Sequence, residues 1–240
     1  QYVESPVVGK ETTVSGPTLS PQTAGAELTP EQVGIGMRIS IHPHADDFER
    51  IILDAIKHTN EVLIPQGLTE GLDIQTGEIS TYVGVKTGDA AQKLATYAAT
   101  LIHSASVASQ RRHLTSHILL SRGCPGGATC ELIPGELPAE KRVFLEKSGI
   151  PAAASWSLYP LTDGNLPHLE PINQAIQEVK DSGLEVSEEH FATTVRGDLS
   201  CVLAVIFNAW AKVGEHVPHV VSHVSLSLDS PSTQRTGDAA

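Results

Sequence analysis

Cysteine is scarce in this chain. Its 240 residues include three cysteines, Cys124, Cys130 and Cys201, and no two of them stand in C-x-x-C spacing. An odd number without that spacing indicates neither a disulfide framework nor a standard zinc motif. We therefore expect a reducing compartment and predict a cytoplasmic protein.

Basic residues are also few. Lys and Arg number 16 against 28 Asp and Glu, which gives a formal net charge of −12. A chain this acidic repels polyanions, so nucleic acids and anionic membrane surfaces are poor partners. A neutral or cationic small molecule is the better electrostatic match.

Long apolar runs are missing as well. The longest run, Cys201 to Ala211, is interrupted by Asn208, and it falls well short of the roughly 20 residues that a membrane helix needs. We therefore predict a soluble protein without membrane insertion.

The chain does contain two copies of one pattern. Three segments of the first half return in the same order in the second half. Residues 39–43 return as 156–160, residues 78–81 as 190–193, and residues 113–117 as 219–223. Because the order is kept while the spacing drifts, these are two diverged copies of one domain rather than the units of a solenoid.

Each copy has the strand and helix signals of a ferredoxin-like unit. The signals come in the order βαββαβ, which is typical of a four-stranded antiparallel sheet with both helices on one face. We therefore predict an α+β fold of two tandem ferredoxin-like repeats. The expected strands are residues 37–42, 68–74, 78–85, 113–121, 154–159, 184–188, 190–196 and 217–228, and the expected helices are residues 46–56, 89–109, 168–180 and 199–214.

Composition divides the chain into five parts. Residues 1–35 are rich in Ser, Thr, Pro and Gly, and we expect a disordered arm there. Repeat 1 covers residues 36–123 and repeat 2 covers residues 152–229. Between them, residues 124–151 form a linker with turn residues and a short helical signal near Ala139 to Lys147. Residues 230–240 are expected to be a disordered tail.

Some of the predicted strands are apolar on both faces. Residues 37–41 and 113–120 carry apolar side chains at both parities, which is typical of a sheet buried on both sides. We therefore expect the face without helices to be covered by the other repeat or by a second chain, and we predict a homodimer. A crevice between such sheets is where we expect a ligand.

The order of these motifs resembles the YkoF family of thiamin and hydroxymethylpyrimidine-binding proteins, over about Met37 to Ser232. The motifs are the S-x-H/Y-P strands at 40–43 and 157–160, the strands at 79–83 and 191–193, the exit at 121–126 and the end at 229–232. The resemblance implies a homodimer with one pyrimidine pocket per repeat. It also implies a non-enzymatic role in thiamin-precursor salvage or transport, with a transporter as a candidate partner.

The resemblance implies contacts at matching positions of the two repeats. They fall on Ile41 and Leu158 through backbone groups, and on Thr81 and Thr193 through the hydroxyl. An aminopyrimidine edge pairs well with a strand's neighbouring N–H and C=O, and a threonine hydroxyl adds one further bond. Alternatively, Thr81 and Thr193 have no ligand role and occur in strands simply because β-branched residues favour strands.

Three further residues are candidates for the ligand site. Ser40 and Ser157 are small and would leave room for a ring, although plain strand serines are equally explicable. Tyr159 is a candidate to stack on the ring. Repeat 1 departs from the pattern of repeat 2, since His42 stands where Tyr159 does and Gly84-Val85 replaces Arg196-Gly197.

An enzyme is the competing interpretation. Paired ferredoxin-like units also serve cofactor-independent oxygenases and isomerases, and eleven histidines allow a metal site at spacings such as His42-x-His44. However, no carboxylate or thiolate stands at a characteristic distance from them, and Asp46 and Asp47 suit the start of a helix. We therefore predict no catalytic residue, no metal and no cofactor apart from the ligand. A ligand-regulated interaction module is a third interpretation.

Overall fold

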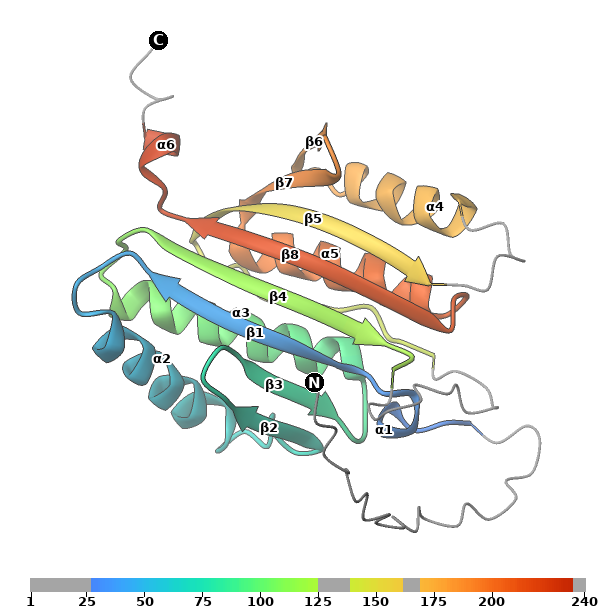
Figure 1. Cartoon of the computed structure of the whole chain (residues 1–240), viewed down its shortest axis with the longest axis horizontal. Helices are drawn as coiled ribbons and strands as arrows, with labels where there is room; N and C mark the ends of the chain where they lie inside the picture. The colour runs from blue at the N-terminus through green and yellow to red at the C-terminus, as the bar shows by residue number, and fades with distance from the viewer. Residues whose placement is uncertain (1–26, 125–138, 162–168, 235–240) are drawn as a thin grey trace, which may run out of the picture.

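The computed structural model describes residues 27–124, 139–161 and 169–234. Repeat 1 holds β1 (Gly36–Pro43), α2 (Phe48–Leu63), β2 (Leu72–Thr76), β3 (Thr81–Val85), α3 (Ala90–Ala108) and β4 (Leu114–Arg122). Repeat 2 holds β5 (Pro151–Leu161), α4 (Leu169–Lys180), β6 (Glu185–Glu189), β7 (Ala192–Asp198), α5 (Leu199–Gly214) and β8 (His219–Leu228). Both repeats have the βαββαβ order, so the predicted tandem ferredoxin-like α+β fold is confirmed (Figure 1).

The two repeats join edge to edge in one antiparallel sheet. Its eight strands run in the order β2-β3-β1-β4-β8-β5-β7-β6, so the last strand of each repeat pairs with the other in the middle. Leu114 lies opposite Leu228 at one end of this pairing, and Arg122 lies opposite Val220 at the other. The sequence left two possibilities for what covers the sheet face without helices, the other repeat or a second chain. The first, in which the sheet of one repeat stacks on the sheet of the other, is therefore wrong.

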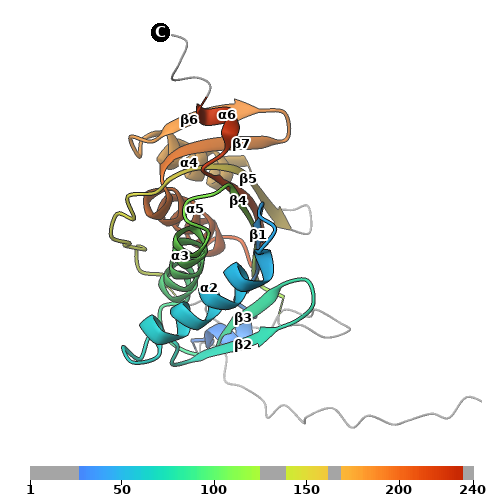
Figure 2. The same cartoon turned by 90° about the vertical axis from the view of Figure 1, so that its left-hand side faces the viewer.

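The four long helices all lie on one face of this sheet (Figure 2). Alternate residues of β1, namely Met37, Ile39 and Ile41, point to that face and are buried. Trp156 of β5 is buried with them, and its ring nitrogen donates to Ser222 Oγ at 2.8 Å. The main core therefore lies between the sheet and its helices, and Trp156 is a core residue.

The opposite face, here named the open face, is not covered by any of these four helices (Figure 2). It carries the intervening residues, because cross-strand partners share a face and side chains alternate along each strand. On the four central strands these are Gly36, Arg38, Ser40 and His42 of β1; Thr115, His117, Leu119 and Ser121 of β4; His219, Val221, His223, Ser225 and Ser227 of β8; and Pro151, Ala153, Ser155, Ser157, Tyr159 and Leu161 of β5.

The segment just before β1 is ordered, although the sequence predicted a disordered arm up to residue 35. Helix α1 (Pro30–Val33) has a capping box, in which Thr29 and Gln32 bond each other's backbone N–H. Leu28 and Val33 are buried in the core. The predicted arm therefore does not include residues 27–35, and its remainder, residues 1–26, lies outside the described residues. At the other end, α6 (Pro231–Gln234) is a short helix within the predicted tail.

The described part of the linker has no regular secondary structure near residues 139–147, where the sequence predicted a helix. The Gln92 side chain of α3 bonds both the N–H and the C=O of Phe144, at 2.8 and 3.0 Å. The Asn208 side chain of α5 bonds both groups of Val143 in the same way, at 2.7 and 3.2 Å. Because these two amides replace the hydrogen bonds that a helix would make, the predicted helix does not form. Asn208 thus has a structural role within an apolar helix.

The structure bears on two expectations from the sequence, the lack of a membrane helix and the lack of a disulfide. Within residues 27–124, 139–161 and 169–234, no helix is long and apolar enough to cross a membrane. Cys124 is disulfide-bonded and Cys201 is a free thiol. The expectation of no disulfide is therefore wrong, and the cysteine content no longer argues for a reducing compartment.

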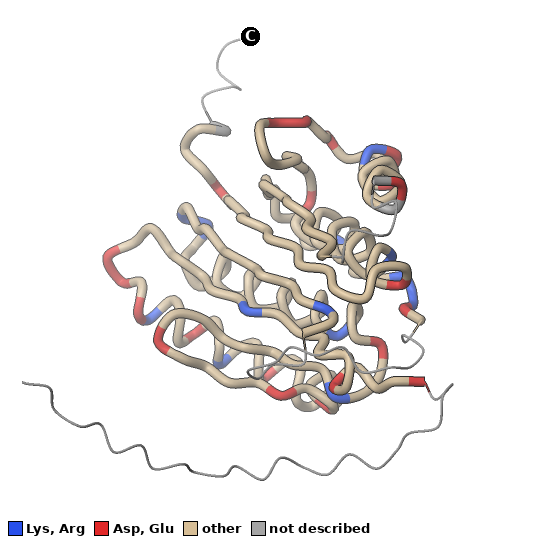
Figure 3. Tube along the Cα trace, turned by 45° about the vertical axis from the view of Figure 1, so that its right-hand side comes forward, with Lys and Arg blue, Asp and Glu red and all other residues tan. Residues whose placement is uncertain are grey.

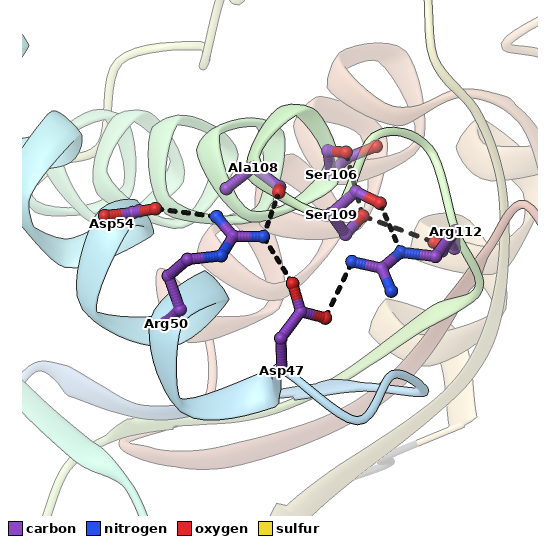
Figure 4. Close-up of polar contacts among 7 residues, drawn as sticks. All are labelled: Asp47, Arg50, Asp54, Ser106, Ala108, Ser109 and Arg112. Carbon is purple, nitrogen blue, oxygen red and sulfur yellow. Dashed lines mark hydrogen bonds and ion pairs between the residues drawn. The ribbon is translucent and has the colours of Figure 1, made fainter.

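Asp47 joins the start of α2 to the turn between α3 and β4 (Figure 4). Its carboxylate accepts hydrogen bonds from Arg50 at 2.6 Å and from Arg112 at 2.8 Å. Arg112 in turn donates to the Ser109 carbonyl at 2.8 Å. The bond from Arg50, with help from Arg112, holds the pKa of Asp47 below its ordinary value. Asp47 therefore has a structural account that needs no acid–base role.

We expect Asp47→Asn to lower the urea midpoint of unfolding at pH 7. A carboxyl whose pKa is lowered in the fold stabilises it above its unfolded pKa of about 3.9 and loses this contribution as the pH falls through the lowered value. The gap between variant and wild type should therefore close below about pH 3. Asp54→Asn, which removes a contact of Arg50 alone, is the matched control and should have the smaller effect. A gap that does not change with pH would contradict this account.

Candidate functional site

In repeat 1 the central strand β1 is longer than its neighbour β3. Pairing between the two ends at Ile39 opposite Thr81, while β1 continues to Pro43 and stays paired with β4 on its other side. Residues 40–43 therefore have a free edge toward the β3 side within the described residues. We name it the first free edge.

The direction of the backbone groups along β1 follows from three hydrogen bonds. Ile35 C=O accepts from Val85 N–H on the β3 side at 2.9 Å, whereas His44 N–H donates to the His113 carbonyl on the β4 side at 3.0 Å. The Ser40 carbonyl also points to β4, where it accepts from Ser116 Oγ at 2.8 Å. Since successive residues alternate, the N–H and C=O of Ile41 point into the first free edge.

Repeat 2 repeats this arrangement. Pairing of β5 with β7 ends at Trp156 opposite Thr193, and β5 continues to Leu161 beside β8. Ile150 C=O accepts from Leu199 N–H at 2.8 Å on the β7 side. By alternation, the N–H and C=O of Leu158 point into this second free edge.

Two prolines at equivalent positions support this assignment. Pro43 and Pro160 close the S-x-H/Y-P motifs, and each lies two residues after the exposed peptide groups of Ile41 or Leu158. The backbone nitrogen of each proline therefore faces the free edge. A strand tolerates proline there, because its lack of an N–H costs no hydrogen bond to a neighbouring strand. The duplicated proline thus marks the unpaired side of the strand.

A threonine stands at the start of each free edge. Thr81 and Thr193 are 7% and 9% exposed, and both lie on the helix face because their partners Ile39 and Trp156 do. The Thr81 hydroxyl is 3.2 Å from that of Thr76. Within the described residues, the Thr193 hydroxyl makes no hydrogen bond. Thr81 therefore lies opposite the residue two positions before Ile41, and Thr193 opposite the residue two positions before Leu158.

The other three candidates lie on the opposite side of the sheet. Ser40, Ser157 and Tyr159 belong to the open face, because they alternate with Ile41 and Leu158 along the strands. Ser40 Oγ bonds His42 at 2.9 Å, and Ser157 Oγ donates to the carbonyl of Phe191 at 3.0 Å. The seven predicted residues therefore do not share one face.

Two exposed apolar residues next to the threonines did not enter the prediction. Ile79 and Phe191 are 87% and 96% exposed and stand two residues before Thr81 and Thr193. Phe191 also has a φ of 68°, which is uncommon for a residue of this size. The repeat alignment already placed Ile79 against Phe191, so the duplication was the signal for them.

Two cavities occupy equivalent places where β1 and β5 begin. The first, of about 460 Å³, includes Gly36, Tyr82 and Gly84, and the second, of about 660 Å³, includes Ala153 and Arg196. Gly84 leaves room for the Tyr82 ring, because a Cβ there would lie 2.3 Å from the phenol oxygen. The Gly84-to-Arg196 departure between the repeats therefore changes these cavities, which lie away from the free edges.

Metal-ligating side chains do not gather around one point in the part of the chain that the structure describes. No group of three or more His, Cys, Asp or Glu side chains is placed to hold a metal ion there. What the free edges offer is different in kind, since a peptide N–H, a peptide C=O and a hydroxyl are neutral hydrogen-bonding groups. Such groups can pair with the donors and acceptors at the edge of a polar planar ring.

The sequence is similar to a family model and to a known protein. The YKOF-related family model matches residues 151–233. A Bacillus subtilis protein named "Putative HMP/thiamine-binding protein YkoF" is 27% identical over 200 residues, which cover 82% of this chain and 91% of the relative.

Solved structures also show similarity to parts of the chain. A Streptococcus pneumoniae protein is 16% identical with a TM-score of 0.33, covering 37% of this chain and 97% of that one. A Thermotoga maritima protein described as a "putative thiamine biosynthesis/salvage protein" is 17% identical with a TM-score of 0.29, covering 32% and 81%. A Bacillus cereus domain of unknown function is 23% identical with a TM-score of 0.29, covering 32% and 74%.

The family match and the full-length relative agree with each other and with the tandem fold. The family model falls on repeat 2, where the second free edge lies, and the relative extends the likeness across most of the chain. The resemblance to the YkoF family seen in the sequence is therefore confirmed.

Proposed function

We propose that the protein binds thiamin or its hydroxymethylpyrimidine part without turning it over, at one site in each repeat. The observation that carries the proposal is the duplicated free edge, where Ile41 and Leu158 offer backbone groups next to Thr81 and Thr193. The name of the Bacillus subtilis relative supports the same ligand class. A role in the salvage or transport of thiamin precursors, in the cytoplasm and with a transporter as partner, is the physiological side of the proposal.

The chemistry of the ligand matches these groups. An aminopyrimidine presents an exocyclic N–H donor next to a ring-nitrogen acceptor, and the C=O and N–H of one strand residue complement that pair. The threonine hydroxyl then binds a further polar atom of the ring. Each net bond is worth about 1 kcal/mol, whereas a buried group left without its partner costs about 1 to 3 kcal/mol. The site therefore selects the ring by its pattern of donors and acceptors.

Charge favours the thiazolium of thiamin over a phosphate ester. The chain has a formal net charge of −12, which attracts a cation and repels an anion. We therefore place thiamin and the free pyrimidine ahead of the phosphorylated forms.

Calorimetric titration with thiamin and with hydroxymethylpyrimidine tests the proposal. Thr81→Val and Thr193→Val each remove one hydroxyl at nearly constant shape, so each should weaken binding in its own repeat by about tenfold to a hundredfold. Thr194→Val is the matched control, because this equally buried neighbour of Thr193 points to the other face and bonds Glu189. It should leave the affinity unchanged.

Two results would count against the proposal. Absence of heat with either ligand would remove thiamin as the ligand and favour the enzyme interpretation. Equal loss of affinity in Thr193→Val and Thr194→Val would mean that the site is not at the second free edge.

The proposal includes a homodimer formed through the open face. Leu119 and Tyr159 on the central strands of that face are 42% and 50% exposed. Of the two possibilities expected from the sequence for covering this face, a second copy of the chain is the one that remains. Light scattering at micromolar concentration would measure the mass of the assembly, and a monomer would remove this part of the proposal while leaving ligand binding to its own test.

A further inference from the structure

Histidines gather in a row across the open face. His44 stacks on His113 with ring centroids 4.3 Å apart, His42 lies 5.4 Å from His117, and His117 lies 6.3 Å from His223 in parallel orientation. These five residues come from β1 and the turn after it, from β4 and the turn before it, and from β8. We name them the histidine ladder, and it crosses the seam between the two repeats.

Serines of the same face hold the ladder in place. His42 bonds Ser40 at 2.9 Å, His117 bonds Ser225 at 3.0 Å, and His113 bonds Ser227 at 3.2 Å. A serine hydroxyl donates to or accepts from a neutral ring, whereas a protonated ring can only donate. These pairs therefore suit neutral imidazoles but supply no anion for charged ones.

The open face differs in charge from the rest of the molecule. On the central strands β1, β4, β8 and β5, the open-face residues include no Asp or Glu, and Arg38 is the one with a permanent charge. In Figure 3 the coloured charges lie mostly on helices, turns and outer strands, while the central strands are nearly all tan. Two copies with a net charge of −12 each repel one another elsewhere. A second copy is therefore the occupant that this neutral face fits.

Groups around His42 and His113 favour the neutral form of these two ladder residues. Burial, then His117 and His44, lower the pKa of His42, and burial with His44 lowers the pKa of His113 against the opposing effect of Asp229. Asp229 is itself bound by two hydrogen bonds from Arg111. Other groups on the same face are Arg38 of β1, His219 of β8 and Tyr159 of β5, and none of these is Asp or Glu. Further burial under a second copy would act in the same direction.

We propose that the histidine ladder makes the pairing of two copies through the open face reversible by acid, with the faces joined while the imidazoles are neutral and released when they are protonated. This inference rests on the homodimer of the proposed function and not on its ligand. It rests on geometry, because any pairing of two copies through this face buries both ladders. Protonation would then place several positive charges in one dry interface.

The effect should be large between about pH 7.5 and pH 5.5, the range in which histidine titrates. A histidine whose pKa falls by one unit on burial changes the dissociation constant by up to about tenfold below both values, and each histidine occurs twice in a dimer. We therefore expect the dissociation constant to rise by at least about tenfold over this range.

Sedimentation velocity of the full chain at both pH values is the test. The triple variant His42→Gln, His117→Gln and His223→Gln replaces three imidazoles with polar amides that stay neutral in acid. It should therefore remain dimeric at the lower pH. His58→Gln with His216→Gln is the matched control, because both residues lie outside the ladder and are exposed. It should dissociate as the wild type does. Circular dichroism at both pH values establishes that each variant is folded.

NMR titration of the ladder imidazoles gives a readout that does not depend on the variants. In the wild type the pKa values of His42 and His113, which burial lowers, should rise when the protein is diluted to monomer. A dimer with equal strength at both pH values, or pKa values that do not move on dilution, would overturn the inference. A monomer at the higher pH would overturn the dimer itself, and thiamin binding measured on the same sample would show that the ligand part of the proposal stands apart.

Discussion

Glu140→Ala should lower the free energy of unfolding by about 3 kcal/mol, which makes it one of the two most damaging single changes expected in this chain. Glu140 and Arg122 form an ion pair at 3.0 Å, with side chains 4% and 0% exposed. The other carboxylate oxygen of Glu140 accepts the Ala91 N–H at the start of α3, at 3.2 Å. Removal of Glu140 thus takes a buried carboxylate away from a guanidinium and a helix N-terminus at once.

The double variant Arg122→Met with Glu140→Met separates the pair from its members. Burial raises the pKa of Glu140 and lowers that of Arg122, with the pairing opposing both shifts, so desolvation of the charges costs much of what their attraction returns. We therefore expect the double variant to be clearly more stable than Glu140→Ala. Urea denaturation of wild type, both single variants and the double variant gives the coupling free energy. Additive single effects would contradict a mutual dependence of the two charges.

This pair also shows how the linker holds the repeats. Glu140 follows the end of β4 by 18 residues and returns to Arg122 of that strand, while Val143 and Phe144 are bound by Asn208 and Gln92 of the two central helices. No local sequence pattern predicts these contacts. The two amide contacts join residues about 50 or more positions apart, and the ion pair buries two charges that the sequence alone would place at the surface. That is why the helical signal near residues 139–147 misled: tertiary bonds to side-chain amides outweighed a weak local preference.

Elements with strong local signals were predicted well. Helix α5 spans Leu199–Gly214, as expected, because Asp198 caps its first turn through Ser200 and Cys201 and an apolar run follows. The pairing of β4 with β8 had no such signal. Both strands alternate in the same way, so periodicity fits an edge-to-edge sheet as well as two stacked sheets, and the choice depends on contacts about 100 residues apart.

The candidate site was predictable in part. Ile41 and Leu158 were assigned a backbone role, and their peptide groups do face the free edges in both repeats. Ser40 and Ser157 are adjacent to them in the strands, and alternation alone sends adjacent side chains to opposite faces. Their place on the open face could therefore have been deduced from the sequence. What the sequence could not give is the residue at which β3 and β7 begin, since the start of a strand depends on the turn that precedes it.

Gly123→Ala is the second change from which we expect a large loss, about 3 kcal/mol or more. Gly123 has a φ of 93°, and a Cβ on it would lie 1.9 Å from the Pro218 carbonyl oxygen. Its N–H also donates to the Val33 carbonyl at 3.0 Å. The glycine thus lets the end of β4 pass between α1 and the turn that leads into β8, which accounts for its place in the S-R-G-C-P-G exit motif.

Gly149→Ala separates the two causes of this loss. Gly149 has a similar φ of 72°, but a Cβ there would meet nothing within 4 Å. It should therefore cost only the strain of a left-handed backbone, about 1 to 2 kcal/mol. The excess in Gly123→Ala, measured by urea denaturation of both variants, is the effect of pushing Pro218 away and with it the start of β8. Since β8 pairs with both β4 and β5, that displacement acts on the seam between the repeats, and equal losses in the two variants would mean that the seam tolerates it.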